Sequence, residues 1–159
     1  MRLLHSIIIA LLPLAESFVR EDRAVSRNNE WYADCRYLRP ECVSKQYERL
    51  GNNTAAKYLL KKLKEAEFQL ENKKWRNDEK IACYRPGSGP EGFCLFFVLL
   101  PYVSVSYPID NVIRALEAIQ YVQTQVDCCG QCGRGWRFDW DMPSLKLDYV
   151  KNACKDICY

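Results

Sequence analysis

The stretch CCGQCGRGWRFDWDM, from Cys128 to Met142, carries two patterns in succession. Three cysteines fall within its first five residues, and aromatic and charged residues then alternate from Trp136 to Asp141. A reactive thiol pair, a metal knuckle, or disulfides beside a binding surface would each fit such a stretch. The rest of the sequence is needed to decide among them.

The first residues of the chain have the composition of a secretory signal peptide. One basic residue precedes an apolar run from Leu3 to Leu14, and the small residues Ala15 and Ser17 stand at the two positions that a signal peptidase reads before it cleaves after Ser17. The apolar run is too short for a membrane span of about 20 residues. The alternative is a short buried N-terminal helix. We therefore expect residues 1–17 to be a signal peptide, 18–30 a flexible mature N-terminus, and 31–159 a single cysteine-rich domain of a secreted protein.

All nine cysteines follow that segment, which predicts a disulfide framework. The nine are Cys35, Cys42, Cys83, Cys94, Cys128, Cys129, Cys132, Cys154 and Cys158. Four bridges would use eight thiols, and the odd thiol is then free or bonded to another chain, which leaves a covalent homodimer open. Eight cysteines can pair in about a hundred ways, so the spacing does not assign the bridges. Cys83 and Cys94 flank a loop rich in Gly and Pro and could close it, and the adjacent Cys128 and Cys129 should bond to different partners.

The segment Cys129-Gly-Gln-Cys132 resembles the CGxC motif of thioredoxin-like proteins in these four residues. In that family the pair opens a helix, whose N-terminus lowers the pKa of the thiol. Here the pair follows a predicted helix and glycines come next, so we expect structural disulfides rather than redox catalysis. A zinc knuckle would need a second CxxC or a Cys-His pair, and Cys154-x3-Cys158 is the nearest candidate. We therefore predict no metal site and no cofactor.

Histidine is almost absent from the chain. The single histidine, His5, lies within the predicted signal peptide. Ser-His-Asp hydrolases, Cys-His proteases and histidine-dependent nucleases all need an imidazole that titrates near neutral pH. We therefore predict that the protein is not an enzyme and has no catalytic residues, although carboxylate and thiol chemistry stay open.

The pattern of apolar residues predicts a mainly α fold. It indicates a small disulfide-stapled helical domain of three to four helices, with at most one short strand pair. Helical spacing places Leu59, Leu63, Ala66 and Leu70 on one stripe of a long helical region. The predicted helical segments are 41–50, 52–80, 109–127 and 141–158.

Two segments are less clear from periodicity. The apolar run 93–108 fits a buried strand or a central core helix. In the last segment we expect Leu147, Val150, Cys154 and Ile157 to share one face of a helix, with the two cysteines as neighbours on it.

The alternation after Gly135 predicts an extended segment. Trp136, Phe138 and Trp140 would then face one way, with charged residues on the other side. This segment either covers the core beside the cysteines or presents an exposed aromatic surface to a partner protein or a sugar. Large aromatic side chains and Arg are typical anchors of interfaces, so the candidate binding surface is Trp136, Arg137, Phe138 and Trp140.

The net charge of +3 is mild. The lysines of region 52–80 alternate with glutamates, which is typical of a solvated helix face, and we expect no nucleic acid partner. Membrane contact through this basic helix or through residues 93–105 is not favoured. Asn52 begins an Asn-Asn-Thr sequon and is the predicted glycosylation site.

These features favour a secreted, disulfide-rich, non-enzymatic protein that binds an extracellular or cell-surface protein, as a toxin, an effector or a ligand does. One alternative is a secreted hydrolase that works through two carboxylates and is similar in outline to animal lysozymes. Its available carboxylates are Glu117, Asp127, Asp139 and Asp141. The other alternative is a membrane-perturbing basic helical protein.

Overall fold

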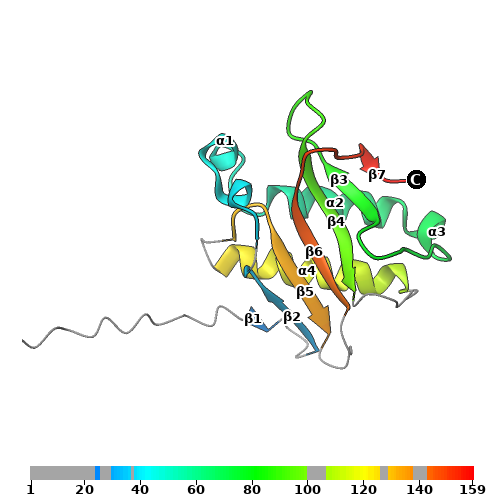
Figure 1. The fold of residues 1–159 in the computed structure, drawn as a ribbon. Helices are drawn as coiled ribbons and strands as arrows, with labels where there is room; N and C mark the ends of the chain where they lie inside the picture. Colours follow the sequence, from blue (N-terminus) through cyan, green and yellow to red (C-terminus); the bar gives the residue numbers. More distant parts are fainter. Residues whose placement is uncertain (1–23, 26–29, 37, 100–106, 126–128, 138–142) are drawn as a thin grey trace, which may run out of the picture.

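The structure is a computed structural model that describes residues 24–25, 30–36, 38–99, 107–125, 129–137 and 143–159. Its centre is a seven-stranded antiparallel sheet with the strand order β1-β2-β5-β6-β4-β3-β7 (Figure 1). The strands are β1 (Ala24–Val25), β2 (Trp31–Asp34), β3 (Lys80–Tyr84), β4 (Gly92–Leu99), β5 (Gly133–Arg137), β6 (Pro143–Val150) and β7 (Asp156–Ile157).

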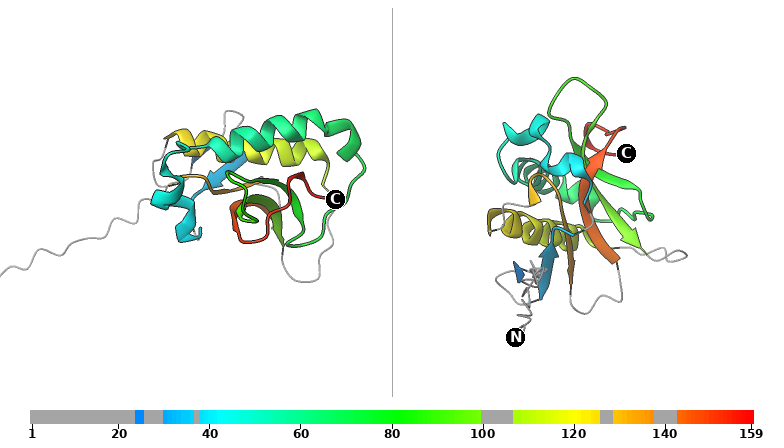
Figure 2. Two further views of the ribbon diagram at one scale, coloured as in Figure 1. Left: turned by 90° about the horizontal axis from the view of Figure 1, so that it is seen from above. Right: turned by 60° about the vertical axis from the view of Figure 1, so that its left-hand side comes forward.

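The helices are the 3-10 helix η1 (Pro40–Val43), α1 (Lys45–Glu48), α2 (Thr54–Glu65), α3 (Glu67–Leu70) and α4 (Ile109–Gln125). Helices α2 and α4 form a layer on one face of the sheet, and η1 and α1 lie at one end of it (Figure 2). Helix α4 packs on β2, β5 and β6, and α2 packs beside α4 on β3. Among the described helices, none combines the length and apolarity that crossing a bilayer requires.

The prediction of a mainly α fold is wrong. The segment predicted as the last helix is instead β6 and β7. In β6, Leu145, Leu147 and Tyr149 alternate with Lys146 and Asp148, and this period of two fits a strand with one buried face. The good helix-forming character of Leu and Lys concealed that period. Consequently Leu147 and Val150 lie on opposite sides of a strand rather than on one helix face.

Several local predictions are confirmed. A helix begins at Ile109, and Leu59, Leu63, Ala66 and Leu70 are all buried in the core. The long helical region ends at Leu70, however, and the chain is irregular from there to β3. The predicted helix 41–50 is divided into η1 and α1, and the ambiguous apolar run begins with strand β4.

Two glycines of β5 explain how α4 reaches the sheet. A Cβ atom on Gly133 would lie 2.5 Å from Cγ2 of Ile119, and one on Gly135 would lie 2.5 Å from the carbonyl oxygen of Ala115. Both distances are shorter than side-chain contacts allow, so only glycine lets the helix pack this closely. Since side chains alternate along a strand, Arg134 and Trp136 point away from the helices.

Eight cysteines form four disulfides, as the predicted framework requires. The pairs are Cys35–Cys129, Cys42–Cys132, Cys83–Cys94 and Cys154–Cys158. The predicted bridge across the β3–β4 loop is therefore confirmed, and the CxxC cysteines bond to distant partners rather than to each other. The ninth cysteine, Cys128, lies outside the described residues, as do the predicted signal peptide and most of residues 18–30.

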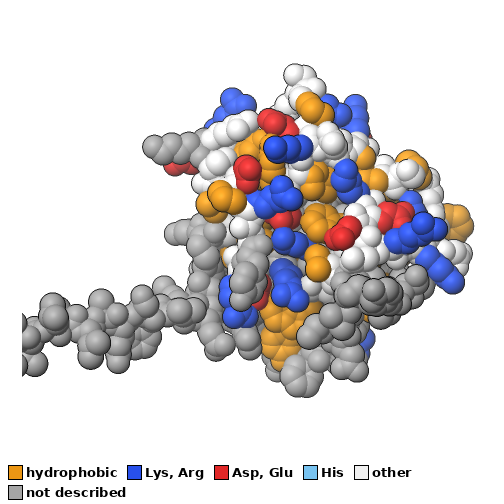
Figure 3. Space-filling view, viewed as in Figure 1, with side chains coloured by type: hydrophobic (Ala, Val, Ile, Leu, Met, Phe, Trp, Pro, Cys, Tyr) orange, Lys and Arg blue, Asp and Glu red, His pale blue; other side chains and the backbone are white. Residues whose placement is uncertain are grey.

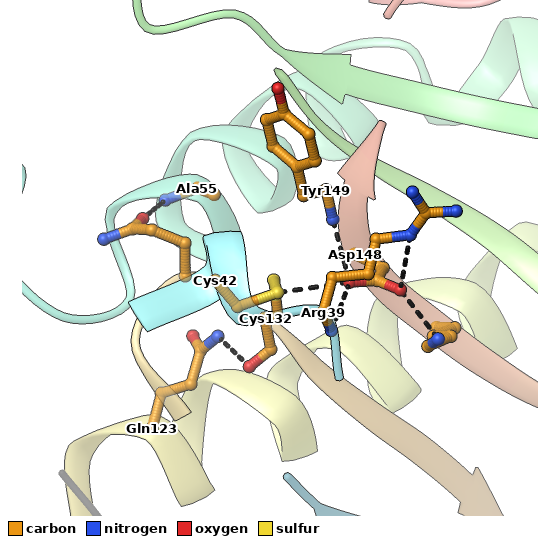
Figure 4. The surroundings of a disulfide bond; sticks show 9 residues. Arg39, Cys42, Ala55, Gln123, Cys132, Asp148 and Tyr149 are labelled. Atoms are coloured by element: carbon orange, nitrogen blue, oxygen red, sulfur yellow. Dashed lines mark hydrogen bonds and ion pairs between the residues drawn. A yellow bond between two sulfur atoms is a disulfide. The ribbon is translucent and has the colours of Figure 1, made fainter. Parts of the chain in front are cut away.

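The turn between these CxxC cysteines joins several elements. Gln131 accepts a hydrogen bond from the backbone N–H of Ala55 at 2.9 Å, at the start of α2. Gln123 of α4 donates to the carbonyl oxygen of Cys132 at 2.7 Å (Figure 4). The two bridges of this turn close chain separations of 94 and 90 residues, which strongly restricts the unfolded chain. The CxxC motif is therefore a structural junction.

Candidate binding face

The sheet face opposite α2 and α4 carries charged and hydrophobic side chains (Figure 3). We name it the open face. It consists of Tyr32, Asp34, Phe96, Val98, Arg134, Trp136, Lys146 and Asp148 on the strands, together with Arg36 and Arg39, which bind its two aspartates. Lys and Arg side chains and hydrophobic groups are interspersed over the strands in this view (Figure 3).

An aromatic pair lies at the β2–β5 side of the open face. The rings of Tyr32 and Trp136 stack with centroids 6.1 Å apart and an interplanar angle of 21°. The guanidinium of Arg134 lies 5.7 Å from the centroid of the Trp136 ring, within the range of a cation–π contact. All three residues are partly exposed.

A buried carboxylate lies under the centre of the open face. Asp148 is 2 % exposed and receives hydrogen bonds from the backbone N–H groups of Tyr149, at 2.9 Å, and Arg39, at 3.3 Å (Figure 4). The ammonium of Lys146 is 2.7 Å from its second oxygen, and Nε of Arg39 is 3.9 Å from it. The sulfur of Cys42 lies 3.1 Å from the first oxygen, so the Cys42–Cys132 bridge adjoins this charge cluster.

A second buried carboxylate, that of Asp34, lies under the β2 side. Nε and the backbone N–H of Arg36 donate to it at 3.0 and 3.3 Å. Arg134 is its direct cross-strand neighbour, and it donates to the hydroxyl of Ser144 at 2.7 Å. Both aspartates of the face are therefore held by cations and backbone groups.

Charge is distributed unevenly with depth across this face. The side chains of Asp34 and Asp148 are each 3 % exposed, whereas those of Arg36 and Arg39 are 37 % and 55 % exposed. Hence the negative charges lie beneath the surface and the positive charges reach solvent. Such an arrangement can bind an anionic group through arginine donors while the stacked rings contact an apolar group beside it.

The structure separates the four residues predicted as the binding surface. Trp136 belongs to the open face, and Arg137 pairs in register with the buried Trp31 and so lies on the opposite side of β5. Phe138 and Trp140 lie outside the described residues. The residues that the prediction missed are Tyr32, Arg134, Lys146 of β6, and the arginines that precede η1, Arg36 and Arg39. The Leu-Lys-Leu-Asp alternation of β6 was the signal that could have revealed Lys146.

The residues of the alternative hypotheses lie elsewhere. Glu117 projects from α4 and forms an ion pair with Lys64 at 2.8 Å, and Asp127, Asp139 and Asp141 lie outside the described residues. Some lysines of the basic region are paired as well, since Lys62 lies 3.2 Å from Glu65.

Two further features concern modification and metal binding. The sequon residue Asn52 is exposed in the turn before α2. Within the described ranges, two groups of metal-ligand atoms lie close together: Cys42–Cys132 with Asp148, and Cys83 with Cys154–Cys158. The sulfurs of both groups are engaged in disulfides, whereas a metal ligand is a thiolate.

Tyrosine hydroxyls bind carboxylates at the rim of the sheet. Tyr47 and Tyr149 both donate to Glu91, at 3.4 and 3.1 Å. Burial, reinforced by the charge of Glu91, raises the pKa of Tyr47 to about 12. Tyr58 donates to Asp156, and this hydrogen bond is the main reason that its pKa is raised to about 12.

No protein-family model, curated protein or solved structure matches this chain. Its function must therefore be inferred from the open face, the disulfides and the composition of the sequence.

Proposed function

We propose that this is a secreted, disulfide-stapled, non-enzymatic binding protein whose open face binds an acidic segment of an extracellular or cell-surface protein. The observation that carries the proposal is the direct cross-strand pairing of two cations, Arg134 on β5 and Lys146 on β6. Like charges directly opposite each other in a sheet are destabilising. Asp148 offsets the charge of Lys146 from beneath, and a bound carboxylate would contact both cations from the solvent side.

Charge complementarity selects the chemistry of the partner. The four cations of the face are Arg36, Arg39, Arg134 and Lys146, and the two acids that offset them are buried. An approaching surface therefore meets these cations before it meets the two aspartates. The Tyr32–Trp136 stack beside them favours a segment that carries an apolar or aromatic residue among its acidic ones.

The shape of the sheet favours binding by its face rather than by its edge. Its two outer strands, β1 and β7, are only two residues long each. So short an edge offers few backbone groups to an added strand. The open face, in contrast, spans four strands.

Other features support secretion and a role without catalysis. Residues 1–17 have the composition of a signal peptide, and the chain after His5 contains no histidine. The four disulfides suit a protein that acts in an oxidising compartment. Toxins, effectors and endogenous ligands share these properties, and glycosylation at Asn52 would modify the helical layer rather than the open face.

The test measures binding of the fluorescently labelled protein to cells and identifies which residues of the protein and of its target are in contact. We compare the double variant R134Q/K146Q with K57Q/K61Q, which removes the same charge from the exposed surface of α2, and with D148N, which breaks the same buried ion pair but removes no cation. Charge-assisted hydrogen bonds contribute about 1.5–3 kcal/mol each, so R134Q/K146Q should weaken binding about tenfold or more. Soluble poly-glutamate should compete, and binding should fall as salt rises.

A carbodiimide, which joins amines to carboxylates directly, should link Lys146 to an acidic residue of the target. Equal loss of binding in the two double variants would refute a role for the open face. Binding that is removed by heparin lyase but resists protease would identify a sulfated glycan instead and would contradict the proposed protein target.

A further inference from the structure

Four sulfur atoms from three parts of the chain meet at the β3 side of the sheet. The buried bridge Cys83–Cys94 joins β3 to β4, and the bridge Cys154–Cys158 closes a short loop around β7. The sulfurs of Cys83 and Cys158 are 3.6 Å apart, which is van der Waals contact. The sulfurs of Cys83, Cys154 and Cys158 all lie within 4.8 Å of one another.

The two bridges differ in accessibility. Cys83 and Cys94 are fully buried, whereas Cys154 and Cys158 are half-buried. The outer bridge spans only four positions of sequence, and β7 joins β3 through only two residue pairs. A reagent that reaches this cluster from solvent therefore meets the outer bridge first.

A hollow of about 310 Å³ opens beside the cluster. Its lining includes Cys83 and two cationic side chains, Arg85 and Lys155. Asp156 also lines it and offsets one of the two positive charges, while its carboxylate accepts a hydrogen bond from the hydroxyl of Tyr58. Nearby cations stabilise thiolates and attract anions, so the hollow suits a small thiol that carries carboxylate groups.

We propose that this cluster is a thiol-exchange site for a small anionic thiol of the glutathione class. The thiolate of the small molecule attacks the sulfur of Cys154, forms a mixed disulfide with it, and expels Cys158 as a thiolate. The Cys158 thiolate then attacks the adjacent sulfur of Cys83, forms a Cys83–Cys158 bridge, and expels Cys94 as a thiolate. Each step forms one S–S bond, breaks one, and consumes and releases one thiolate, so no separate oxidant is needed.

The exchange would change both the covalent framework and the open face. The new bridge spans 75 residues, instead of the 11 and four residues that the original bridges span, and it fastens the C-terminal segment directly to β3. It also releases Cys94, the cross-strand neighbour of Asp148 on the open face. This inference stands independently of the proposed partner protein.

The first experiment uses the full chain with Cys128→Ser, so that the ninth cysteine cannot exchange. The protein is incubated with reduced glutathione, quenched with acid, alkylated, and analysed by peptide mass mapping without reduction. We expect a Cys83–Cys158 crosslinked peptide, alkylated Cys94 and glutathionylated Cys154. The Cys35–Cys129 and Cys42–Cys132 bridges should stay intact and serve as the internal control. A product with Cys154 and Cys158 open and Cys83–Cys94 intact would overturn the proposal.

A second experiment needs no added thiol. In the same background, Cys154→Ser leaves Cys158 as a thiol 3.6 Å from Cys83, and the Cys83–Cys158 bridge with a free Cys94 should form spontaneously. Retention of Cys83–Cys94 with a free Cys158 alone would contradict the mechanism. The variant R85Q/K155Q should slow the reaction with glutathione about threefold or more but not that with neutral 2-mercaptoethanol. If R85Q/K155Q slows the reactions with glutathione and with 2-mercaptoethanol equally, the cations of the hollow do not recognise the anionic thiol, and that part of the proposal is wrong.

Discussion

The contact between α4 and β5 can be tested by adding one methyl group. In Gly135→Ala the new Cβ would lie 2.5 Å from the carbonyl oxygen of Ala115, which belongs to the backbone of α4. A backbone atom cannot rotate away as a side-chain end can, so the helix or the strand must shift. The shift would disturb the packing of fully buried residues such as Leu116 and Ile119.

The expected cost follows from two opposing effects. Overpacking a core by a methyl group costs about 1–3 kcal/mol. Replacing Gly by Ala also restricts the unfolded chain, which returns about 0.4–1 kcal/mol. We therefore expect Gly135→Ala to lower the free energy of unfolding by about 1–2 kcal/mol.

The matched control is Gly87→Ala in the β3–β4 loop. A Cβ atom there would meet nothing within 4 Å, and Gly87 has no positive φ, so this variant should be as stable as the natural chain or slightly more stable. The assay is equilibrium unfolding in urea without reductant, monitored by tryptophan fluorescence. If Gly135→Ala unfolds at the same urea concentration as Gly87→Ala, the close packing of α4 on β5 is incorrect.

Three other predictions follow from the described contacts. Asp148→Asn should destabilise the fold by about 3 kcal/mol, because it leaves the ammonium of Lys146, which is only 20 % exposed, without its carboxylate. Urea unfolding measures this cost, and a change of less than about 0.5 kcal/mol would contradict the buried charge cluster. Because the pKa values of Tyr47 and Tyr58 are about 12 in the folded protein and about 10 in the unfolded chain, their stabilising contribution is complete below pH 10 and is lost as the pH rises from 10 to 12. Absorbance titration at alkaline pH should show late-ionising tyrosines, which include Tyr107 and Tyr149 because burial raises their pKa as well. Tyr47→Phe and Tyr58→Phe should each remove one ionisation from this late group. Intact mass after alkylation without reduction should show either a monomer with one label, on Cys128, or an unlabelled covalent dimer, whereas three labels would contradict the four bridges.

Local sequence patterns were sufficient for some features of this protein. The helix from Ile109 and the burial of Leu59 and Leu63 follow from a period of 3.6 residues, which depends only on neighbours along the chain. The bridge between Cys83 and Cys94 was predictable because a loop with Gly and Pro brings cysteines of adjacent strands together. The number of cysteines likewise indicated four bridges and one thiol left over.

Only the tertiary structure decided the fold class, the long-range bridges and the position of the open face. Whether the LKLD segment of β6 is strand or helix depends on its two neighbours in the sheet, the nearby β5 and, along its whole length, β4, which is distant in sequence. The pairing of Cys35 and Cys42 with the CxxC turn likewise depends on where the sheet places β2 and η1. The same alternation that buries Leu147 places Lys146 opposite Arg134 on one side and opposite Phe96, which is far away in the chain, on the other. Cross-strand contacts form between residues far apart in the chain, so a sequence shows which side chains alternate but not which residues they will face.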